Sequence, residues 1–557
     1  MSLPLKAASW NVCSRTGSWT GISSSPRRSS SVPPALWLIL LASIWMLASC
    51  AGKPAPSDGT LPTYDPFLHE GNGGGVFQAG PSGDSEHQGS RGPTPTLAPL
   101  SVTVPARASG AALATPTPDY AHPVPTLRAE VDSYVVQPGD TLASIAESFG
   151  VSTDSLAGEN AIENQDLLAV GSTLKVPPPA VATPGPSFKI IPNSELVYGP
   201  ASAEFDIGDF VDGEAGYLSD YAEDIGTETL TGSEIVQRVA ESYSINPRLL
   251  LAVLQHRSQW VTNPQPPPDS LDYPLGLVEP NREGLYHQLS WAATQLNRGY
   301  YLWRANAVAT WVLHDGSVVP IDPTINAGTA GVQNLLAAQD DRSAWDADTG
   351  PFGLFQTYFF LFGNPFDLAI EPLVPATLTQ PPMQLPFERG VTWAFTGGPH
   401  AAWDAGSAWA ALDFAPPDVM GCAVSTQWVA AVANGFIVRS SDGQVIEDLD
   451  GDGFEQTGWN VLYMHIFSQD RVPARSYVYA GDLIGHPSCE GGVANAAHLH
   501  IARKYNGEWI PADGQLPFAL GGWISSGNGI EYDGYLTRGD STLEAAEGAS
   551  QLNTIVR

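Results

Sequence analysis

The stretch NAAHLHIARK, residues Asn495–Lys504, places two histidines one residue apart among apolar neighbours. Successive side chains of a β-strand point to opposite faces of the sheet, so His498 and His500 would project from the same face. The chain has only eleven histidines, and two of them on one strand face can serve a single site. We therefore expect this stretch to be a strand that carries functional residues.

The surrounding region, from about residue 382 to 536, consists of short apolar runs separated by glycine-containing turns. Such spacing predicts an all-β antiparallel domain. Two further histidines lie in it: His400 follows a Gly-Gly-Pro turn, and His465 ends the run LYMH. A hydrolytic zinc centre takes three protein ligands of the His, Asp or Glu type and leaves a fourth position to water. His400, an aspartate and one histidine of the pair satisfy that count.

These residues, in this order, resemble the M23 (LytM or lysostaphin-like) zinc metallopeptidases. The matching elements are an early His and Asp, a Tyr-x-His strand, a His-x-His pair and the connecting phrase AGDLIG. The resemblance implies a lysostaphin-like fold and a Zn²⁺ cofactor. Its implied ligands are His400, Asp413 and His500. By the same resemblance, His465 and His498 would orient the attacking water, accept its proton and stabilise the oxyanion.

Two alternatives concern this set of residues. The family's usual spacing of three residues between the first His and the Asp would select Asp404, in HAAWDAG, instead of Asp413. Asp413 is preferred because LDFAPP reproduces the apolar strand and the proline that follow the ligand, whereas Asp404 precedes a Gly-Ser turn. The other alternative is that the histidines are ordinary hydrogen-bonded side chains of a β core.

The run DLDGDG has the alternating carboxylates of a calcium loop, at Asp448, Asp450 and Asp452. An EF-hand needs a glutamate where this chain has Trp459. We therefore interpret the run as a solvated hairpin loop, with calcium binding as the alternative. Residues 537–557 are expected to form a C-terminal tail.

Residues 133–177 predict a small α+β module with a strand, a turn, two short helices and a closing strand. The segment resembles a LysM domain over its whole length, with the pattern Gly-Asp-Thr-Leu, Ile-Ala, Leu, Asn and Val-Gly-x-x-Leu. That resemblance implies binding to N-acetylglucosamine-containing glycans such as peptidoglycan. The residues that it places near the sugar are Gly139, Asp140, Thr141, Asn160, Ala161 and Ile162. Considered one at a time, such residues are more often turn and cap residues.

Residues 188–370 predict a mostly helical module that follows a Pro-rich linker at 178–187. Thr231 and Glu234 form a capping-box pattern, and Asn246-Pro247 predicts a second helix start. Both signals lie just before runs with helical periodicity.

The phrase SINPRLLLAVLQHRSQW in this module resembles the opening of a lytic transglycosylase or goose-type lysozyme domain. In that family a Glu immediately before the Ser is the catalytic acid, but here Arg257 precedes Ser258. An arginine stays charged throughout the useful pH range and cannot protonate a glycosidic oxygen. We therefore expect a lysozyme-like module without that activity, and a helical spacer with an aromatic core is the alternative.

Residues 1–49 predict a signal peptide, with a basic region and an apolar run that is too short for a comfortable membrane span. The tetrapeptide Leu47-Ala48-Ser49-Cys50 resembles the lipobox of bacterial lipoproteins, which implies lipidation of Cys50. Residues 50–130, rich in Pro, Ser, Gly and Thr, predict a disordered tether. The protein would thus be exported and lipid-anchored to the bacterial membrane, facing the cell wall. An uncleaved anchor is the alternative.

The chain has four cysteines, of which Cys13 would be lost with the leader and Cys50 would be lipidated. Cys422 and Cys489 are then expected to form a disulfide in an oxidising compartment. A thiol metal site, the alternative, lacks the usual Cys-x-x-Cys spacing. The formal net charge of -33 argues against nucleic acid as a partner, because neutralisation of phosphates supplies most of such affinity.

Together these features predict an exported zinc endopeptidase that cuts peptide stems or cross-bridges of peptidoglycan and is held on glycan by its LysM module. The alternative from another class is a catalytically inactive LysM/M23 lipoprotein that regulates other cell-wall hydrolases. A third hypothesis is a wall-binding scaffold with residual glycosidase activity, which Arg257 disfavours.

Overall fold

The computed structural model describes residues 121–137, 139–165, 167–180 and 183–557. The predicted signal peptide at 1–49, the lipidation site Cys50 and most of the predicted tether at 50–130 lie outside the described residues. Within the described part of the chain, no helix is both long enough and apolar enough to cross a bilayer.

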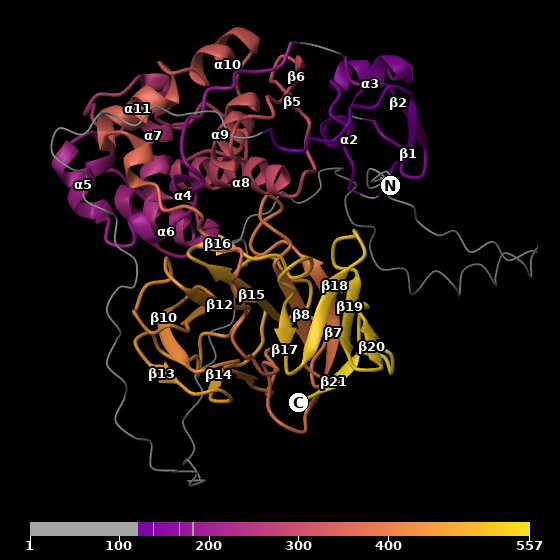
Figure 1. The fold of residues 1–557 in the computed structure, drawn as a ribbon. Helices are drawn as coiled ribbons and strands as arrows, with labels where there is room; N and C mark the ends of the chain where they lie inside the picture. The colour runs from indigo at the N-terminus through magenta and orange to yellow at the C-terminus, as the bar shows by residue number, and fades with distance from the viewer. Residues whose placement is uncertain (1–120, 138, 166, 181–182) are drawn as a thin grey trace, which may run out of the picture. The chain divides into compact units, whose positions relative to one another are not determined.

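The first folded region is the small α+β module (Figure 1). Its elements are β1 (Asp132–Val135), α2 (Leu142–Ser148), α3 (Thr153–Glu159) and β2 (Thr173–Val176). Strand β1 pairs antiparallel with β2, and Leu142, Ile145 and Leu156 are buried between helices and strands. Thr141 caps α2 and Ser152 caps α3, each through its side-chain oxygen. The predicted α+β arrangement is confirmed.

The end of the predicted tether is packed, which corrects the boundary at residue 130. Arg128 donates hydrogen bonds to the carbonyls of Phe149 and Pro177, and His122 stacks on Trp303 with ring centroids 4.5 Å apart. By donating to several carbonyls, the guanidinium of Arg128 holds the end of the tether in place, although the composition of this segment predicts disorder.

The predicted linker at 178–187 is also partly packed. Gly185 donates its N–H to the carbonyl of Pro320 at 2.8 Å, and a Cβ at this position would lie 2.7 Å from the ring of Trp345. Glycine therefore allows the chain to pass close to that ring.

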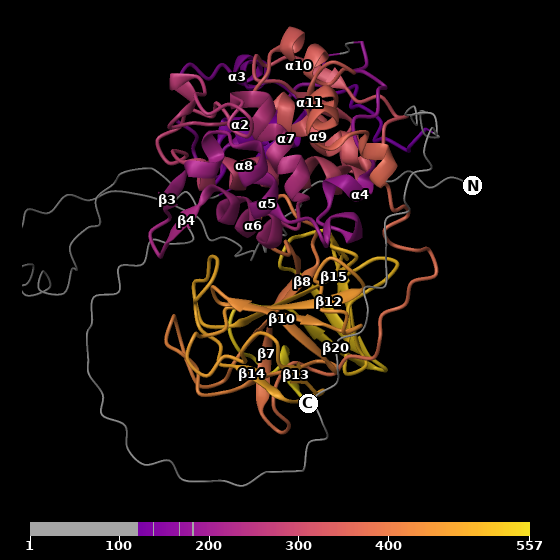
Figure 2. The same cartoon turned by 90° about the vertical axis from the view of Figure 1, so that its left-hand side faces the viewer.

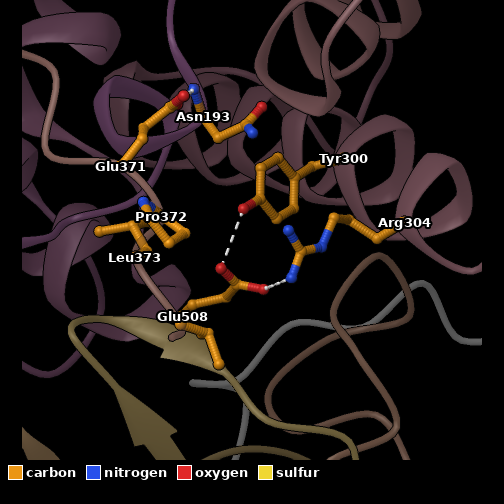
Figure 3. Close-up of a pocket in the computed structure, with 8 residues that line it drawn as sticks. Asn193, Tyr300, Arg304, Glu371, Pro372, Leu373 and Glu508 are labelled. Carbon is orange, nitrogen blue, oxygen red and sulfur yellow. Dashed lines mark hydrogen bonds and ion pairs between the residues drawn. The ribbon is translucent and has the colours of Figure 1, made fainter. Parts of the chain in front are cut away.

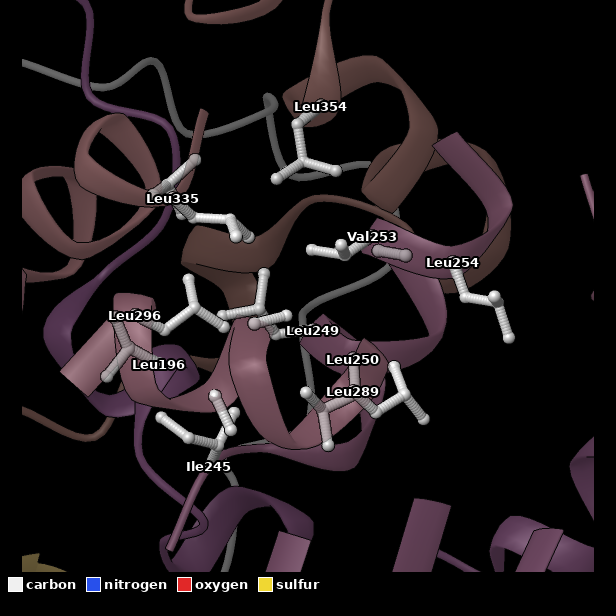
Figure 4. Close-up of a cluster of buried hydrophobic side chains, with 14 of the residues drawn as sticks. Leu196, Ile245, Leu249, Leu250, Val253, Leu254, Leu289, Leu296, Leu335 and Leu354 are labelled. Atoms are coloured by element: carbon white, nitrogen blue, oxygen red, sulfur yellow. The ribbon is translucent and has the colours of Figure 1, made fainter. Parts of the chain in front are cut away.

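The middle region is mostly helical, as predicted, and its buried leucines and valines form one large apolar cluster (Figure 4). Its helices are α4 (Asn193–Leu196), α5 (Ile207–Glu214), α6 (Gly232–Tyr243), α7 (Pro247–Ser258), α8 (Leu285–Arg304), α9 (Ala327–Ala337), α10 (Arg342–Asp348) and α11 (Leu354–Phe362). Two short hairpins complete it: β3 (Ala222–Asp224) with β4 (Thr229–Thr231), and β5 (Thr310–Val312) with β6 (Val318–Pro320). Its 3-10 helices are η2 (Pro200–Ser202), η3 (Tyr217–Asp220), η4 (Pro268–Ser270) and η5 (Pro365–Leu368).

Arg257 lies in the last turn of α7 and is held by two carboxylates. Its guanidinium forms a bidentate pair with Asp340 at 2.9 and 3.1 Å and lies 3.4 Å from Asp348. A guanidinium fork matches a carboxylate in this way. Arg257 thus ties α7 to the segments around α9 and α10.

The C-terminal region is built on a nine-stranded antiparallel sheet (Figures 1 and 2). Its strand order is β13-β10-β11-β12-β15-β8-β7-β21, with β16 paired to β15. The bounds are β7 (Thr392–His400), β8 (Ala411–Ala415), β10 (Gly435–Ser441), β11 (Gln444–Asp448), β12 (Trp459–Met464), β13 (Tyr477–Val478), β15 (Leu499–Tyr505), β16 (Glu508–Trp509) and β21 (Thr554–Val556). A four-stranded sheet follows, with β17 (Ala519–Leu520), β18 (Trp523–Gly527), β19 (Gly534–Arg538) and β20 (Ser541–Glu544). A separate pair joins β9 (Val429–Ala430) to β14 (Leu483–Gly485).

Both faces of the central strands are buried. Val445 and Val461 join one apolar cluster, whereas their neighbours Ile446 and Leu462 join another. Burial on both faces agrees with the mostly apolar sequence WNVLYM of β12, whereas β11, with the sequence QVIED, also buries polar side chains. The predicted all-β antiparallel arrangement of this region is confirmed.

The predicted C-terminal tail at 537–557 is wrong, because these residues complete the β region. Strand β21 pairs with β7, with Ile555 opposite Trp393. Ile555 is buried, and the amide of Asn553 donates to the carbonyl of Phe395. A three-residue strand after a polar stretch carries too little alternation to be predicted.

The start of β16 contacts helix α8 through one buried carboxylate (Figure 3). Glu508 accepts a hydrogen bond from the hydroxyl of Tyr300 at 3.1 Å and pairs with Arg304 at 2.7 Å. These side chains line a cavity of about 320 Å³ together with Glu371. The contact joins the helical region to the edge of the strand pair β15-β16.

The predicted disulfide between Cys422 and Cys489 is confirmed, and it closes a sequence separation of 67 residues. Closing a loop of this size restricts the unfolded chain and stabilises a domain by about 2 to 4 kcal/mol. We expect the double variant Cys422→Ser, Cys489→Ser to lose that amount in denaturant unfolding. Reduced wild-type protein should match the variant, and equal unfolding free energies for oxidised wild type and variant would contradict the prediction.

Candidate metal centre

Three adjacent strands bring His400, Asp413 and His500 together. The sheet order is β15, β8, β7, and Asp413 lies opposite His500 in the register. His400 ends β7, where the pairing with β8 becomes irregular after Gly397. His400 Nε2 lies 3.0 Å from His500 Nδ1, and Asp413 Oδ1 lies 3.2 and 3.3 Å from these two nitrogens. All three side chains are buried.

Backbone carbonyls fix the outer nitrogen of each imidazole. His400 Nδ1 lies 2.8 Å from the carbonyl oxygen of Gly398, and His500 Nε2 lies 2.9 Å from that of Ala402. A carbonyl oxygen only accepts, so these nitrogens carry the hydrogens. In the neutral rings, His400 Nε2 and His500 Nδ1 therefore present lone pairs toward each other and toward the carboxylate of Asp413. Such a group attracts a positive charge.

The three facing atoms fit a zinc ion. Asp413 Oδ1 is buried and makes no directional hydrogen bond, although it lies within 3.7 Å of three imidazole nitrogens. Zinc with four ligands at about 2.0 to 2.2 Å separates neighbouring ligand atoms by about 3.3 Å. The separations of 3.0 to 3.3 Å are close to that value, and two imidazoles with one carboxylate are a common zinc donor set.

His465 and His498 lie beside this group. His465 directly follows β12 with φ 66°, His498 directly precedes β15, and their ring centroids lie 4.5 Å apart. The Nδ1 atom of His465 lies 3.1 Å from the carbonyl of Glu490, and that of His498 lies 2.8 Å from the carbonyl of Ala496. With Nδ1 of each ring donating to a carbonyl, Nε2 is the nitrogen left for chemistry. His498 Nε2 lies 3.7 Å from Asp413 Oδ1.

Burial and neighbouring charges set the protonation states of the site. Burial, with His498 and His500 nearby, holds the pKa of His465 well below its usual value, and burial also lowers the pKa of His500. Burial works to raise the pKa of Asp413, but His400 and His498 outweigh it, so this pKa lies well below its usual range. Asp413 is therefore a carboxylate, while His465 is a neutral ring that can accept a proton.

Asp404, the alternative to Asp413, lies elsewhere. Its Oδ2 accepts a hydrogen bond from Thr294 Oγ1 of helix α8 at 2.6 Å. The structure thus brings Asp413, and not Asp404, to the histidines.

One residue next to the group was missed in the sequence. Tyr532 stacks on the ring of His400, with centroids 4.2 Å apart and planes at 19°. Its carbonyl accepts the N–H of Gly398 at 2.8 Å, and Glu531 accepts the N–H of Ala401. The loop NGIEYD, which joins β18 to β19, carries no spacing that links it to a histidine so far away in the chain.

The residues predicted to lie near a sugar occupy two loops of the α+β module. Asp140 accepts hydrogen bonds from the hydroxyl of Tyr134 and the N–H of Gln137, and Asn160 exchanges two hydrogen bonds with the backbone of Lys175. Thr141 is the helix cap, Gly139 and Ala161 have positive φ, and Ile162 packs on the module's core. These contacts hold the loops in shape, and glycan binding by this set stays a prediction.

The buried Glu447 of strand β11 gives a pH prediction. Burial raises the pKa of Glu447 from 4.5 to about 8, and its carboxyl accepts a hydrogen bond from Tyr463 in the strand before His465. Because folding raises this pKa, the folded protein holds the proton of Glu447 more tightly than the unfolded chain does. The resulting contribution to stability is complete below pH 4.5 and is lost as the pH rises through 8. We expect Glu447→Gln to be more stable than wild type at pH 8.5 by roughly 2 to 4 kcal/mol, and nearly equal at pH 4.5. Urea unfolding at both pH values measures this, and parallel pH curves for the two proteins would refute it.

Two segments of the chain match family models. Residues 134–177 match the LysM domain, which confirms the resemblance stated for that module. Residues 189–375 match the family described as LasA, N-terminal domain, and this segment coincides with the helical region. The predicted lysozyme-like character of that region stays a prediction. No curated protein matches the chain.

Several solved structures are similar to parts of this chain. An M23 metalloprotease named pseudoalterin, from the deep sea, is 25% identical, with 33% of this chain and 100% of that chain covered and a TM-score of 0.26. The catalytic domain of lysostaphin from Staphylococcus simulans is 25% identical, with 22% and 89% covered and a TM-score of 0.16. A zinc-containing peptidase from Vibrio cholerae is 18% identical, with 25% and 41% covered and a TM-score of 0.17.

Proposed function

We propose that this protein is a zinc endopeptidase of the M23 type that hydrolyses peptide stems or cross-bridges of peptidoglycan. The observation that carries the proposal is the convergence of His400 Nε2, Asp413 Oδ1 and His500 Nδ1, all within 3.3 Å of one another. Beside them stands His465, which burial keeps neutral. Three ligand atoms with an adjacent base are the parts that metal-assisted hydrolysis needs.

Zinc held by His400, Asp413 and His500 would supply a Lewis acid for the scissile carbonyl and would lower the pKa of its water from 15.7 toward about 7. His465 accepts a proton from the attacking water at Nε2 as the oxygen bonds to the carbonyl carbon. The same nitrogen then returns the proton to the leaving amine as the C–N bond breaks. His498 orients the attacking water and stabilises the oxyanion that forms.

The LysM match supports peptidoglycan as the place of action, because the domain binds its glycan strands. LysM and M23 domains are typical of extracellular proteins that act on the cell wall. A lipid anchor at Cys50 and a tether would hold the enzyme at the membrane, and binding by LysM would raise the effective concentration of peptide near the site. Weak glycan binding is then sufficient.

The helical region supports the β region without glycosidase chemistry of its own. Its match to the LasA N-terminal domain, a family related to M23 peptidases, supports the peptidase proposal. Arg257 is paired with Asp340 and Asp348 and supplies no acid. We therefore expect no new reducing ends from purified glycan strands.

Mass spectrometry of fragments released from defined muropeptides tests the proposal. The full-length protein, loaded with zinc, should release fragments with new amino and carboxyl termini, and His500→Ala should release none. A protein that holds no zinc and behaves like His500→Ala would instead support the regulator of other cell-wall hydrolases. Stimulation of an added amidase without peptide cleavage would establish that alternative.

A further inference from the structure

Three aspartates lie close together at the turn between β11 and β12, and two of them are buried, whereas the sequence predicts a solvated loop. Asp448 is 0% exposed and Asp452 is 4% exposed, and only Asp450 is open to solvent. One carboxylate oxygen of each lies within 4.8 Å of the others. The carboxylate of Asp448 accepts the backbone N–H groups of Asp450, Gly451 and Gly453. These bonds do not cancel the negative charge of the cluster, and like charges at this separation repel until a proton or a cation binds.

No side chain of the described region supplies that positive charge, since none of the three aspartates forms an ion pair there. Lys504 lies on the neighbouring strand but pairs with Glu455 at 2.7 Å. Arg439 pairs with the same Glu455 at 2.9 Å and with Glu241 at 3.7 Å. The cations near this end of the sheet are therefore already neutralised.

A buried amide oxygen forms a second, independent signal. Asn460 is 0% exposed, and its Oδ1 has no hydrogen-bond partner. Asn460 lies directly opposite Asp448 in the antiparallel pair, so the two side chains stand on the same face of the sheet. The Nδ2 atom of Asn460 donates to the carbonyl of Thr457, whose hydroxyl donates to Asp452. Asn460 is therefore connected to the acidic turn through Thr457 and lies opposite Asp448 in the strand pair.

We propose that the β11–β12 turn is a binding site for a divalent cation of the calcium class, with oxygens of Asp448, Asp450, Asp452 and Asn460 as protein ligands. Every donor is a carboxylate or amide oxygen, the type that hard cations take, and no nitrogen or sulfur ligand is present to favour zinc. The turn precedes β12 and His465 follows it, so a strand of about 20 Å separates this site from the histidines. The cation would hold the end of the sheet and take no part in hydrolysis.

The raised pKa of Asp448 agrees with a cluster of negative charges that no side-chain cation of the described residues neutralises. Burial, together with the neighbouring Asp450, raises the pKa of Asp448 to about 8. Near neutral pH the group therefore takes up either a proton or a metal ion, and the two outcomes are separable by experiment.

The test is a thermal unfolding series on the full-length, zinc-loaded protein in calcium-free buffer and in 10 mM CaCl2 (about ten to a hundred times the dissociation constant of an extracellular calcium site). We expect calcium to raise the Tm of wild type by roughly 3 to 8 °C. Asp450→Asn removes one exposed ligand charge and should abolish most of that rise. The matched control Asp540→Asn changes an exposed aspartate outside the turn and should keep it.

The order of the two Tm values, wild type against Asp450→Asn, should reverse between calcium-free buffer and CaCl2. This reversal distinguishes loss of a calcium ligand from general destabilisation of the fold. In calcium-free buffer Asp450→Asn should unfold at the same temperature as wild type or higher, because one repulsive charge is gone. With calcium it should unfold lower than wild type. Equal Tm values for wild type with and without CaCl2, together with no heat of calcium binding in calorimetry, would overturn the proposal and leave a proton as the occupant. A full calcium response in Asp450→Asn would overturn it too. Neither result bears on the histidine centre.

Discussion

Substituting His500 with alanine is expected to remove zinc from the protein and to lower the rate of peptidoglycan hydrolysis by about 10³-fold or more. His500 Nδ1 is one of three facing ligand atoms, 3.0 Å from His400 Nε2 and 3.3 Å from Asp413 Oδ1. Without it the ion keeps only two protein ligands, and the several kcal/mol that a Lewis acid takes from the barrier are lost. The number of zinc ions per chain and the rate of hydrolysis, measured on the same preparation, test the predicted loss of metal and the predicted loss of activity.

Two matched controls sharpen this experiment. His486→Ala removes a histidine of the same region that packs against the ring of Trp428 and should leave zinc content and rate unchanged. Asp413→Asn should lose zinc, whereas Asp404→Asn, which alters a side chain bonded to Thr294, should retain it. A His500→Ala protein with one zinc per chain and a normal rate would disprove the ligand assignment.

Substituting His465 with asparagine is expected to leave zinc content unchanged and to lower kcat by about 10² to 10⁴-fold, the usual contribution of a positioned general base. Asparagine is chosen because His465 has φ 66°, a left-handed conformation that asparagine tolerates better than alanine does. Zinc content, circular dichroism and steady-state kinetics on a defined peptide substrate distinguish a lost base from a lost fold.

The pH dependence of kcat/KM tests the role of His465 further, because a residue with only a structural role would not change its shape. In wild type, the acid limb of kcat/KM should follow proton uptake by the base, and in His465→Asn that limb should disappear or shift. Loss of zinc in the variant would make His465 a ligand, and an unchanged kcat would exclude it as the base.

Local signals in the sequence predicted much of the helical structure. Thr231 and Glu234 form the predicted capping box, and Asn246 caps a helix that begins at Pro247. These features depend on neighbours three or four residues away, so they are readable without the fold. The closing strand predicted for the small module is found at Thr173–Val176, and it too follows from a short local pattern.

The histidines of the candidate site were found by order and spacing, but the sequence could not decide between Asp404 and Asp413. That choice depends on the register of β8 against β15, where Asp413 faces His500, and register is a property of strands far apart in the chain. Tyr532 was missed because only the folded chain places it on His400. The sequence predicts a solvated acidic turn, but tertiary packing, which no local pattern reveals, buries Asp448 and Asp452.

The loop between β7 and β8 has two attachments with a shared mechanical effect. The backbone carbonyl of Ala402 accepts a hydrogen bond from Nε2 of His500. Two residues later, Asp404 accepts a hydrogen bond from Thr294 of helix α8. The helical region therefore helps to hold the imidazole of His500 in place through this loop, although it contributes no zinc ligand itself. A fragment cut at about residue 382 would retain every donor atom and lose this brace, so its zinc affinity would report how stiffly the imidazole is held.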